Sequence, residues 1–564
     1  FLPKPGTGMA HEPPCPEEEM RWTVAVARLL LDPSIHLQAP PNLASDLAAL
    51  VSAGIDDWGG VSPVTPDHVN PERPWPELER LRVATEAAGK VLAPRLTVYP
   101  EYVCRPEEWL HADVRFPVMC ASDGEGMARE YLWAAGGHES PPDLLAPAAP
   151  GGAGVSPGES AGAGVSAGWK VPRAGGPVGE VLTGVELGQQ VDVDEIVTLL
   201  GARGPQLVAV CELADQLRQK AVGDVVTFVR NRNINYTNVC TFKCRFCAFS
   251  KGPLSLNLRG EPYLLDFEEI QRRVVEAVEC GATEVCLQGG IHPSFDGDYY
   301  LEVTRAVKAV APQIHVHGFT ALEVFEGARR LGMGLPEYLA RLKSAGLATL
   351  PGTAAEILDD EVRAIICPDK VNTDEWLEVH RVAHSIGLRS NVTIMFGHVE
   401  RPVHVARHLV RARNLQAETG GFTEVVPLPF VHMASPIFLQ KKARPGPTFR
   451  EALLIHAVSR IAMAGFIDNI QCSWVKLGLE GARQALRAGC NDLGGTLMNE
   501  NISRAAGAEH GQGVEEEDLA EVVAPLGRPL EQRTTLYGRV RTDGRRLPAP
   551  PPTTSTPVTI GGRR

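Results

Sequence analysis

Short apolar runs alternate with longer helical periods between Val225 and about Gly495, and this alternation restricts the fold more than any other feature. The first such pair is a helix that begins after Asp266, a good N-cap residue, and a buried strand over 284–288. The pattern also predicts helices over 336–345, 374–386, 403–418, 450–464 and 480–488, and strands over 314–317, near 349, and over 391–396, 424–428 and 466–471. About eight β/α units in about 270 residues predict an α/β fold with a closed (β/α)8, TIM-type barrel, and an open parallel sheet is the alternative.

Three cysteines lie on one short stretch, directly after a predicted strand that contains Ile234 and Tyr236. Cys240, Cys244 and Cys247 have the spacing C-x3-C-x2-C. Three thiolates so close together can each bind one iron of a [4Fe–4S] cluster and leave the fourth iron without a protein ligand. A structural zinc site is the alternative, but zinc takes a fourth ligand, commonly in paired C-x2-C units, and no second pair follows. We therefore predict that these cysteines bind a cluster.

With Phe246 directly before the last cysteine, the loop resembles the signature of the radical SAM superfamily. The resemblance implies that the open iron binds the amino and carboxylate groups of S-adenosylmethionine (SAM) and passes it an electron. It also implies that Phe246, Gly289 and Gly290 position this cofactor, since the two glycines form a turn after the second strand. Glycine permits close approach of the backbone to a ligand, although Gly-Gly can also serve only to turn the chain.

Two carboxylates follow predicted strands and are candidates for catalysis. Glu356 ends the segment PGTAAE after the fourth strand, where it could bind the ribose or amino group of the cofactor, or a substrate. It could equally be a solvated residue at a helix start, where the dipole favours negative charge. Asp492 lies in the loop NDLGGT, which could offer a carboxylate and amides to a polyhydroxylated substrate or could form a simple tight turn.

Composition and charge argue against several classes of function. Hydrophobic residues make up 44% and charged residues 22% of the 564 residues, as in ordinary globular proteins. The formal charge of −13 argues against a nucleic-acid surface, and no apolar stretch approaches the roughly 20 residues of a membrane span. Of 12 cysteines three are clustered, which does not suggest a disulfide framework. An oxygen-sensitive cluster needs a reducing compartment, so we expect the cytoplasm, with a plastid as the alternative.

A short motif near the start of the chain recurs near its end. SAGIDDWGGVSP and RAGCNDLGGTLM share Ala-Gly, an acidic or amide pair, a hydrophobic residue and Gly-Gly. A Pro-Gly element (KPGTG, RPGPT) and a helical pattern precede each copy, with helices predicted over 17–31 and 450–464. The offset of about 435 to 440 residues indicates an internal repeat. Because the chain begins with Phe1 and not Met, we expect a fragment of a longer protein.

From about Gly136 to Gly176 the sequence consists mainly of Gly, Ala, Pro and Ser, with almost no large apolar side chains. Such a segment cannot bury enough surface to offset the entropy of ordering, so it is predicted to be a flexible linker. We therefore predict four parts, which are a first module over 1–135, the linker over 136–180, a barrel module over 181–525 with its core at about 225–495, and a disordered Pro-rich tail over 540–564.

Several segments together carry a more specific resemblance. NRNINYTNVCTFKCRFCAFS, CLQGGIHP, PGTAAEIL and GCNDLGGTLMNENISRAAGA are similar to the tyrosine-dependent radical SAM transferase of the FO synthase family, which makes the deazaflavin FO. KPGTGM, IDDWGGVSPVTPDHVNPERPWP and LTVYPEY resemble the C-terminal part of the FO-forming lyase, which precedes the transferase in bifunctional FO synthases. The first module has no C-x3-C-x2-C of its own. We therefore expect a complete transferase joined to only the C-terminal remnant of the lyase, without the cyclisation step.

The resemblance implies a reaction and its partners. An external electron donor of the ferredoxin or flavodoxin type reduces the cluster, and cleavage of SAM gives a 5′-deoxyadenosyl radical that removes a hydrogen from the amino group of L-tyrosine. The Cα–Cβ bond then breaks, and a 4-hydroxybenzyl radical adds to C5 of 5-amino-6-(D-ribitylamino)uracil. The implied cofactors are one [4Fe–4S] cluster per transferase module and S-adenosyl-L-methionine. The motifs do not identify the residues that bind tyrosine or the ribityl chain.

Two alternatives stay open. One is another radical SAM enzyme, of the futalosine pathway to menaquinone, whose cluster loop is similar. The lyase-like N-terminal segment and the ending NDLGGTLMNENIS argue against it. The other is a protein without catalysis, an inactive truncated synthase or a zinc-binding scaffold, which cluster reconstitution followed by EPR spectroscopy would test.

Overall fold

The computed structural model describes residues 3–62, 64–146, 175–252 and 261–540. Contacts divide the chain into two compact units, which are unit 1 (Phe1–Pro94 and Ala174–Gly179) and unit 2 (Arg95–Arg173 and Glu180–Arg564). Unit 2 contains the predicted barrel and also takes in the residues from Arg95 onward, although the sequence places the end of the first module at residue 135. Most of the predicted linker and almost all of the predicted tail lie outside the described residues.

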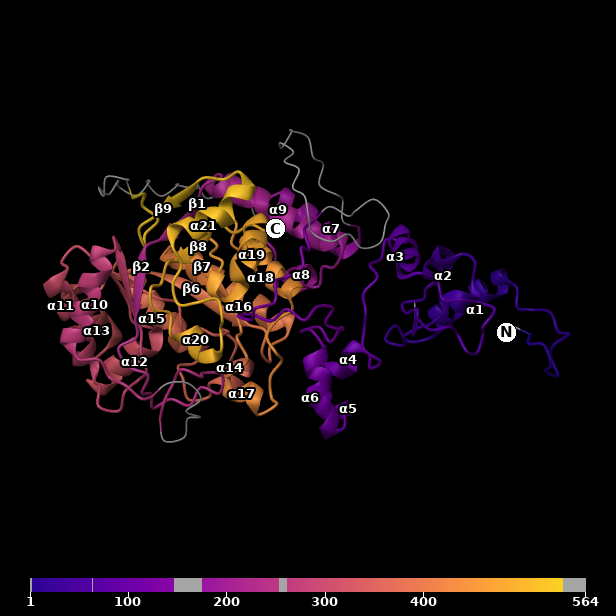
Figure 1. The fold of residues 1–564 in the computed structure, drawn as a ribbon, viewed down its shortest axis with the longest axis horizontal. Helices are drawn as coiled ribbons and strands as arrows, with labels where there is room; N and C mark the ends of the chain where they lie inside the picture. Colours follow the sequence, from indigo (N-terminus) through magenta and orange to yellow (C-terminus); the bar gives the residue numbers. More distant parts are fainter. Residues whose placement is uncertain (1–2, 63, 147–174, 253–260, 541–564) are drawn as a thin grey trace, which may run out of the picture. The chain divides into compact units, whose positions relative to one another are not determined.

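A parallel six-stranded sheet forms the centre of unit 2, in the order β2-β3-β4-β5-β6-β7. Its strands are β2 (Asn231–Ile234), β3 (Glu284–Leu287), β4 (His315–Gly318), β5 (Thr349–Leu350), β6 (Arg389–Phe396) and β7 (Phe422–Pro429). Neighbours in a parallel sheet need a crossover connection, so helices separate these strands along the chain and cover the sheet (Figure 1). All four residues of β3 are buried, as expected for a strand covered on both faces.

The curled sheet returns to its first strand through β8 (Asp492–Gly495). Ile470 and Gln471 form parallel bridges that connect β7 to β8. Beyond β8, the carbonyl of Leu497 accepts a hydrogen bond from the amide of Asn233 in β2 at 2.9 Å. Backbone hydrogen bonds therefore run round the ring, which confirms the predicted α/β barrel of parallel strands.

A second, three-stranded parallel sheet has the order β8-β1-β9, with β1 at Val226–Val229 and β9 at Leu530–Gln532. The strand predicted over 466–471 is wrong for its first half. The amides of Phe466 and Ile467 donate to the carbonyl of Met463 at 2.9 and 3.0 Å, so a turn occupies these positions. The apolar residues there are buried beside the turn and do not extend a ladder.

Helices begin where side chains can cap them. Asp266 accepts a hydrogen bond from the Glu269 amide at 2.8 Å, which confirms the predicted N-cap of α10. The helices between and after the strands include α10 (Phe267–Glu279), α11 (Gly297–Val310), α12 (Ala321–Arg330), α13 (Leu335–Ala345), α14 (Asp360–Ile366), α15 (Thr373–Ser385), α16 (Pro402–Thr419), α18 (Phe449–Ala462) and α19 (Trp474–Arg487). Helix α19 starts before the predicted residue 480, because Gly478 joins two helical pieces in a non-helical conformation with φ 71°.

Further helices flank the barrel. Before it come α7 (Gly176–Glu186), α8 (Val193–Leu200) and α9 (Pro205–Val222), and within or after it α17 (Pro436–Leu439), α20 (Ile502–Ala506) and α21 (Glu516–Val523). Helix α8 packs against α16 and α18, and α9 packs against α18 and α19. Helices α8 and α9 are thus part of the outer layer of the barrel.

The segment over 95–146 is attached to the barrel helices by buried charges. It contains α4 (Pro100–Val103), α5 (Pro106–Trp109) and α6 (Ala112–Ala121). The carboxylates of Asp123 and Glu125 each pair with Arg203 and Arg450 at N–O distances of 2.6 to 3.0 Å. Contacts of this kind explain why these residues belong to unit 2.

The first residues of the predicted linker are bound to α19. The amide of Gly136 donates to the carbonyl of Lys476 at 2.7 Å. Farther along, the amide of Leu144 donates to Oε1 of Gln484 at 3.2 Å. The start of this segment therefore contacts the barrel, whereas 147–174 lie outside the described residues.

Unit 1 contains three helices and a small core. The helices are α1 (Glu17–Leu30), α2 (Leu47–Ala53) and α3 (Leu78–Ala87). Leu50, Ile55, Trp58 and Leu81 are among the buried side chains of the core. Asp46 caps α2 by accepting a hydrogen bond from the Ala49 amide at 2.9 Å.

The internal repeat predicted from the sequence is present in the backbone of both units. In unit 1, Gln38 forms a parallel bridge with Asp57, and in unit 2, Gln471 forms one with Asp492. In each copy the aspartate accepts a hydrogen bond from the amide of the glycine two residues later, at 2.5 and 2.8 Å. A Cβ atom on either glycine would collide with the glutamine of its own pair. The two motifs therefore share a local structure.

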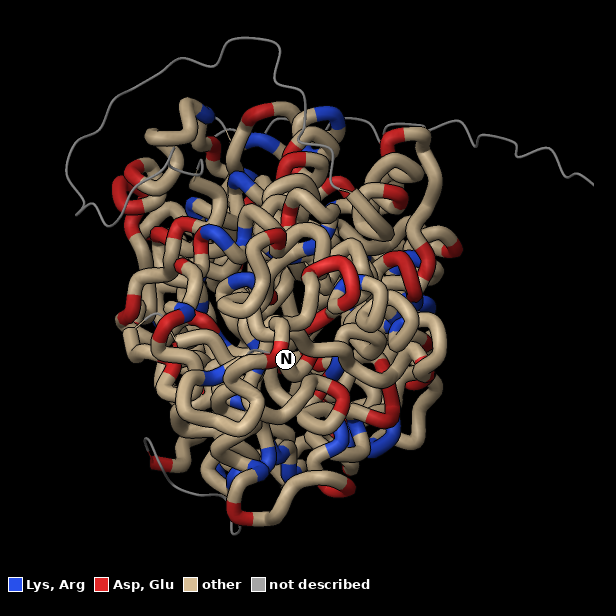
Figure 2. Tube along the Cα trace, turned by 90° about the vertical axis from the view of Figure 1, so that its right-hand side faces the viewer, with Lys and Arg blue, Asp and Glu red and all other residues tan. Residues whose placement is uncertain are grey.

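Lys and Arg residues (blue) and Asp and Glu residues (red) are both scattered over the chain (Figure 2). The excess of acidic residues gives the formal charge of −13. In the part of the chain that the structure describes, no helix combines the length and the apolar character that crossing a membrane requires.

Candidate active site

The cysteine loop follows β2 and lies against the turn that follows β3. The amide of Gly290 donates to the carbonyl of Thr237, and the amide of Thr241 donates to the carbonyl of Ile291, both at 2.9 Å. The amide of Ile291 also donates to Sγ of Cys240 at 3.3 Å. The two loops thus meet at the carboxyl ends of neighbouring parallel strands, where active sites of such barrels lie.

Gly289 and Gly290 make this contact possible. A Cβ atom on Gly289 would lie 2.4 Å from the ring of Tyr236, and one on Gly290 would lie 2.2 Å from the carbonyl oxygen of Val239. No side chain fits at such distances, so both glycines are needed to pack the cysteine loop. Their predicted contact with a cofactor stays a prediction.

The three thiols lie farther apart than the ligands of a single bound ion. Among the described residues, Asp359, Glu361 and His404 are the one group of three or more possible metal ligands whose donor atoms all lie within 4.8 Å of one another. The cysteine sulfurs are therefore spread more widely than a zinc ion requires, since Zn–S bonds of about 2.3 Å place sulfurs about 3.8 Å apart. In a cubane cluster each thiolate binds a different iron, which accommodates the wider spacing.

A buried cation, Lys370, lies beside the cysteines. It donates to the carboxylate of Glu356 at 2.6 Å, and its ammonium lies 5.6 Å from the centroid of the Phe246 ring. Burial lowers the pKa of Lys370, but the nearby Glu356, Cys244 and Cys367 together outweigh this effect and the pKa is raised. Burial raises the pKa of all three loop thiols, and the charge of Lys370 opposes that rise.

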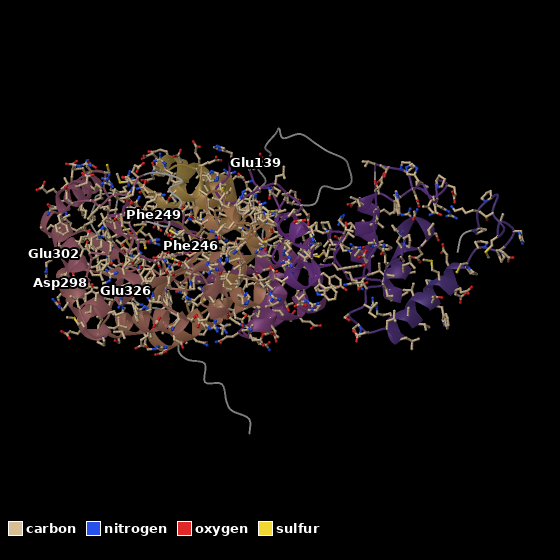
Figure 3. All side chains as sticks on the ribbon, turned by 90° about the horizontal axis from the view of Figure 1, so that it is seen from below. Glu139, Phe246, Phe249, Asp298, Glu302 and Glu326 are labelled. Carbon is tan, nitrogen blue, oxygen red and sulfur yellow. The ribbon has the colours of Figure 1, made fainter. Side chains whose placement is uncertain are left out.

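Two predicted cofactor residues, Phe246 and Glu356, are therefore brought together at the cysteine loop. Figure 3 labels Phe246, directly before Cys247, and Phe249, which lies two residues after it and is buried. The sequence analysis missed Lys370, because a lone lysine after α14 belongs to no recognisable motif. The fold alone brings it to Glu356.

Glu323 is a second residue that the sequence analysis missed. It lies in the first turn of α12 and accepts hydrogen bonds from the Tyr236 hydroxyl and from the Gly289 amide, the latter at 3.1 Å. Burial raises the pKa of this carboxyl group. The pattern Thr320-x-x-Glu323 predicts a capping box, but it does not reveal that the carboxylate also supports the glycine turn.

A cavity of about 230 Å³ lies inside the ring of strands. Its polar lining includes the amides Asn231, Asn235 and Asn391 and the carboxylates Glu284, Glu424 and Glu500. Convergent polar groups in an enclosed cavity suit a ligand with several hydrogen-bonding groups. Gln288 lines the cavity beside the glycine turn, so a ligand there would lie next to the cysteine loop.

Asp492 does not line this cavity, but it pairs with Arg533, which does. Arg533 pairs with Asp492 at 2.5 Å and with Glu424 at 3.2 Å. The hydroxyl of Thr227 also donates to Asp492 at 2.5 Å. These contacts give the carboxylate a structural task, and among the described residues it is not part of the cavity lining. Its catalytic role stays a prediction.

Comparison with known families explains this arrangement. Residues 234–410 match the Radical SAM superfamily, and residues 419–538 match the CofH/MqnC C-terminal region. Over 352 residues the chain is 44% identical to the 5-amino-6-(D-ribitylamino)uracil--L-tyrosine 4-hydroxyphenyl transferase of Methanothermobacter thermautotrophicus, with 62% of this chain and 95% of that protein covered. The chain belongs to the radical SAM superfamily.

Other relatives cover different parts of this radical SAM protein. It is 44% identical over 587 residues to the FO synthase of Nocardia farcinica, which covers 98% of this chain. The chain spans 66% of the length of that relative. The crystal structure of HydG, a maturase of the [FeFe]-hydrogenase, matches with a TM-score of 0.50 and 15% identity over 64% of this chain and 76% of that chain. At this identity the likeness concerns the fold alone.

The relatives correct one expectation about how the radical SAM chain is built. The sequence analysis predicts a complete transferase with only the C-terminal remnant of a lyase. Similarity to an FO synthase instead continues over 98% of the chain at 44% identity, unit 1 included. Similarity to the synthase therefore extends through nearly all of this chain and is not confined to one module with a remnant. The expectation was wrong because it relied on the absence of a second cysteine motif.

Membership in the radical SAM superfamily implies a [4Fe–4S] cluster and SAM. The residues fit this cofactor pair, since Cys240, Cys244 and Cys247 are spaced too widely for one ion and Lys370 offsets the charge of thiolates. These three cysteines would hold the cluster. The number of clusters per module stays a prediction.

The group around Asp359 lies apart from this radical SAM site. The Asp359 carboxylate pairs with Arg407 at 3.3 Å and with Arg411 at 3.2 Å. The two guanidinium groups already neutralise the carboxylate and would repel a metal cation. The group with Glu361 and His404 is therefore an ion-pair network on the surface of the barrel.

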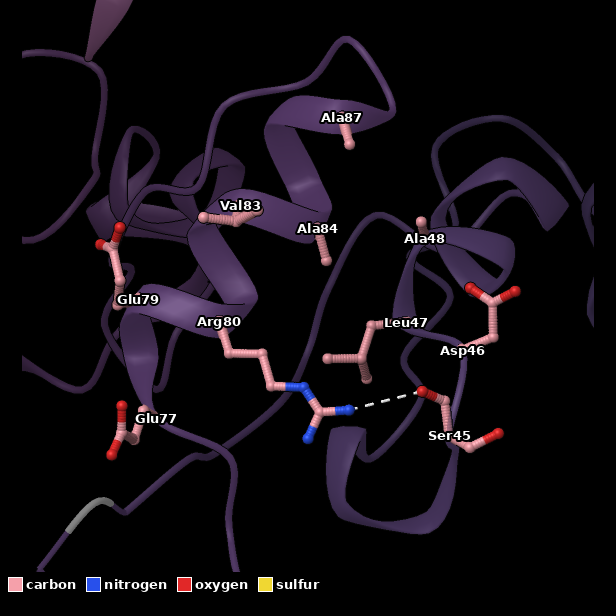
Figure 4. Close-up of a pocket in the computed structure, with 10 residues that line it drawn as sticks. All are labelled: Ser45, Asp46, Leu47, Ala48, Glu77, Glu79, Arg80, Val83, Ala84 and Ala87. Carbon is pink, nitrogen blue, oxygen red and sulfur yellow. Dashed lines mark hydrogen bonds between the residues drawn. The ribbon is translucent and has the colours of Figure 1, made fainter. Parts of the chain in front are cut away.

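A larger hollow of about 570 Å³ belongs to unit 1, between α2 and α3 (Figure 4). Arg80 reaches across it and donates to the carbonyl of Ser45 at 3.5 Å. Its lining combines small apolar side chains, such as Ala84, with exposed charges and contains no cysteine or histidine. The hollow holds none of the groups that radical SAM chemistry uses.

Proposed function

We propose that the barrel transfers a 4-hydroxybenzyl group from L-tyrosine to 5-amino-6-(D-ribitylamino)uracil in FO biosynthesis. The observation that supports this proposal is the 44% identity to a transferase of that name over 95% of its length. The polar cavity beside the cysteine loop suits the second substrate, because amides and carboxylates can bind the hydroxyls of a ribityl chain.

In this proposal the bound cofactors supply the radical, and residues of the chain shape the site around them. When bound, the cluster and SAM supply the 5′-deoxyadenosyl radical. Phe246 and Lys370 shape the surface next to the cluster cysteines, and the glycine turn brings the cavity close to them. The ring of strands surrounds a cavity of about 230 Å³, and a substrate that fills it would displace water that could quench a radical.

The proposal includes FO biosynthesis beyond the transfer step. Similarity to an FO synthase through unit 1 supports a contribution of both units to FO formation. We also propose an electron donor of the ferredoxin or flavodoxin type and a reducing compartment, as the oxygen sensitivity of the cluster requires.

Anaerobic reconstitution tests the transfer. The protein would be loaded with iron and sulfide, reduced, and incubated with SAM, L-tyrosine and the ribitylaminouracil. We expect 5′-deoxyadenosine and a hydroxybenzyl adduct by mass spectrometry, with FO followed by its fluorescence. The variant Cys244→Ala should lose both products, whereas Cys280→Ala, which alters an exposed cysteine outside the loop, should keep them.

Two results would contradict the proposal. Formation of 5′-deoxyadenosine without any adduct would favour a different radical SAM reaction, such as that of the futalosine pathway. Stoichiometric zinc without an EPR signal from a reduced cluster would favour a scaffold.

A further inference from the structure

No carboxylate of the described residues forms an ion pair with the ammonium group of Lys476. Among the described residues that line the cavity, Lys476 and Arg533 carry the permanent positive charges. Arg533 forms ion pairs with Asp492 and Glu424. Lys476, at the start of α19, donates to Oγ of Ser503 at 2.6 Å. An ammonium has three donor hydrogens, and in the described part of the chain this is its one hydrogen bond.

Glu500 lies on the other side of Ser503 and lines the same cavity. Its Oε2 accepts hydrogen bonds from the amides of Ser503 and Arg504 at 2.8 and 3.4 Å. Within the described ranges, no donor is bonded to Oε1 of Glu500. Burial lowers the pKa of Lys476 and Glu500 opposes this, so the two charges interact. They are nevertheless not within the N–O distance of 4.0 Å that defines an ion pair.

The two opposite charges are therefore held apart, with Ser503 bonded to both. An ammonium that lines a cavity with only one of its three donors used is unfavourable, because the lost hydrogen bonds to water are not all replaced. A ligand carboxylate would provide that acceptor, and a ligand ammonium would bind the open oxygen of Glu500. An α-amino acid carries both groups on one carbon, and here both protein charges are bonded to one residue, Ser503.

We propose that Lys476 and Glu500 bind the α-carboxylate and the α-ammonium group of an amino-acid substrate, respectively. This inference rests on the proposed function, in which the amino acid is L-tyrosine. It adds the residues that recognise the head group, which neither the motifs nor the relatives identify.

Asn235 independently indicates that the cavity is built for a polar ligand. This residue follows β2, is 2% exposed and lines the cavity. Its Nδ2 donates to the carbonyl of Gln288 at 3.2 Å, whereas its Oδ1 has no hydrogen-bond partner among the described residues. A buried acceptor without a partner is costly, so a donor group of a ligand would be stabilised there.

Binding of three related compounds to the cluster-loaded protein, without reductant, tests the proposal. The compounds are L-tyrosine, tyramine, which lacks the carboxylate, and 3-(4-hydroxyphenyl)propanoate, which lacks the amine. We expect the wild type to bind L-tyrosine on the order of tenfold to a hundredfold more tightly than either analogue, as measured by equilibrium dialysis.

Each variant should remove the preference of the site for one group of the ligand, either the carboxylate or the ammonium. In Lys476→Met, L-tyrosine should bind no better than tyramine, while the affinity for tyramine stays near wild type. In Glu500→Gln, the preference over the propanoate should disappear. Lys476→Arg keeps the charge and should keep the preference for a carboxylate. Lys343→Met, on an exposed lysine of α13, is the matched control and should change nothing.

The outcomes separate this inference from the proposed function. If Lys476→Met weakens L-tyrosine and tyramine equally, or weakens SAM binding instead, the head-group assignment is overturned. If the wild type does not bind L-tyrosine but binds another α-amino acid with the same dependence on Lys476, the head-group assignment stands and the proposed function fails. If tyrosine is converted and both variants keep their preferences, the function stands and the assignment fails.

Discussion

The contact between the cysteine loop and the glycine turn depends on a position that has no side chain. A Cβ atom on Gly290 would lie 2.2 Å from the carbonyl oxygen of Val239, which is part of the backbone and cannot rotate away. The next residue, Ile291, donates its amide to Sγ of Cys240. Any side chain at 290 must therefore push the cysteine loop away from the turn.

We expect Gly290→Ala to lower the iron and sulfide bound after reconstitution severalfold and to reduce the free energy of unfolding by about 1–3 kcal/mol, because the added methyl group overpacks the contact. Metal analysis and urea unfolding measure both effects. The control is Gly334→Ala, whose Cβ would meet only Pro336 Cδ at 3.8 Å. Full cluster content in Gly290→Ala would contradict this account.

His456 makes the stability of the barrel depend on pH. It is fully buried in α18, and its Nδ1 bonds to the Ala452 carbonyl at 2.7 Å. Burial lowers its pKa from 6.5 to about 4. The folded pKa lies below the unfolded value, so the neutral form stabilises the fold above pH 6.5. That stability, roughly 3 kcal/mol, is lost as the pH falls from about 6.5 to about 4.

Replacing this side chain should reduce the acid sensitivity. In His456→Leu we expect the loss of unfolding free energy between pH 7.5 and pH 5 to be smaller than in the wild type by about 2 kcal/mol. Urea unfolding at the two pH values measures it. His111→Leu, at an exposed histidine, should leave the loss unchanged. An unaltered pH dependence in His456→Leu would show that this histidine does not titrate with folding.

Helix α12 shows how the start of one element ties together two loops of the active site. Thr320 and Glu323 form a capping box at its N-terminus. The same Glu323 carboxylate accepts hydrogen bonds from the Tyr236 hydroxyl, after β2, and from the Gly289 amide, after β3. The helix start thus holds both loops in register.

We expect Glu323→Gln to reduce the free energy of unfolding by about 1–3 kcal/mol, because the amide nitrogen cannot accept the hydrogen bonds that one carboxylate oxygen accepts. Cluster loading should fall as well, since the glycine turn loses its support. Thermal unfolding and iron content measure these effects. Glu337→Gln, in the exposed first turn of α13, is the matched control and should behave as wild type. Equal stability of the two variants would refute the proposed role of α12.

At the scale of the molecule, buried charges attach the segment over 95–146 to the barrel. The side chain of Asp123 is 1% exposed and pairs with both Arg203 and Arg450. Asp143 belongs to the same segment and pairs with Arg487, but its side chain is 48% exposed. Solvent screens the second pair and not the first, so the two should differ strongly in energy.

We expect Asp123→Asn to destabilise unit 2 by about 3–5 kcal/mol, because two buried guanidinium groups lose part of their compensation. Limited proteolysis should then cut faster within 95–135. Asp143→Asn should change the free energy of unfolding by less than about 1 kcal/mol. Urea unfolding with mass spectrometry of the fragments makes the comparison. Similar behaviour of both variants would mean that the buried network does not hold the segment.

Features that depend on neighbours along the chain could be predicted from the amino-acid sequence. Strands and helices follow from the period of apolar residues, and the cap at Asp266 follows from its position before such a period. The cluster loop follows from the spacing of Cys240, Cys244 and Cys247. Each of these patterns acts over a few residues, so no knowledge of distant contacts is needed.

Contacts between residues of different segments of the chain could be found only from the three-dimensional structure. In the folded protein Lys370 bonds to Glu356, Arg533 pairs with Asp492, and Lys476 and Glu500 line one cavity. Each partner is an ordinary charged residue in its own segment, so no local pattern marks it. The physical reason is that the strength of a charge depends on burial and on partners far along the chain, and the fold alone sets both.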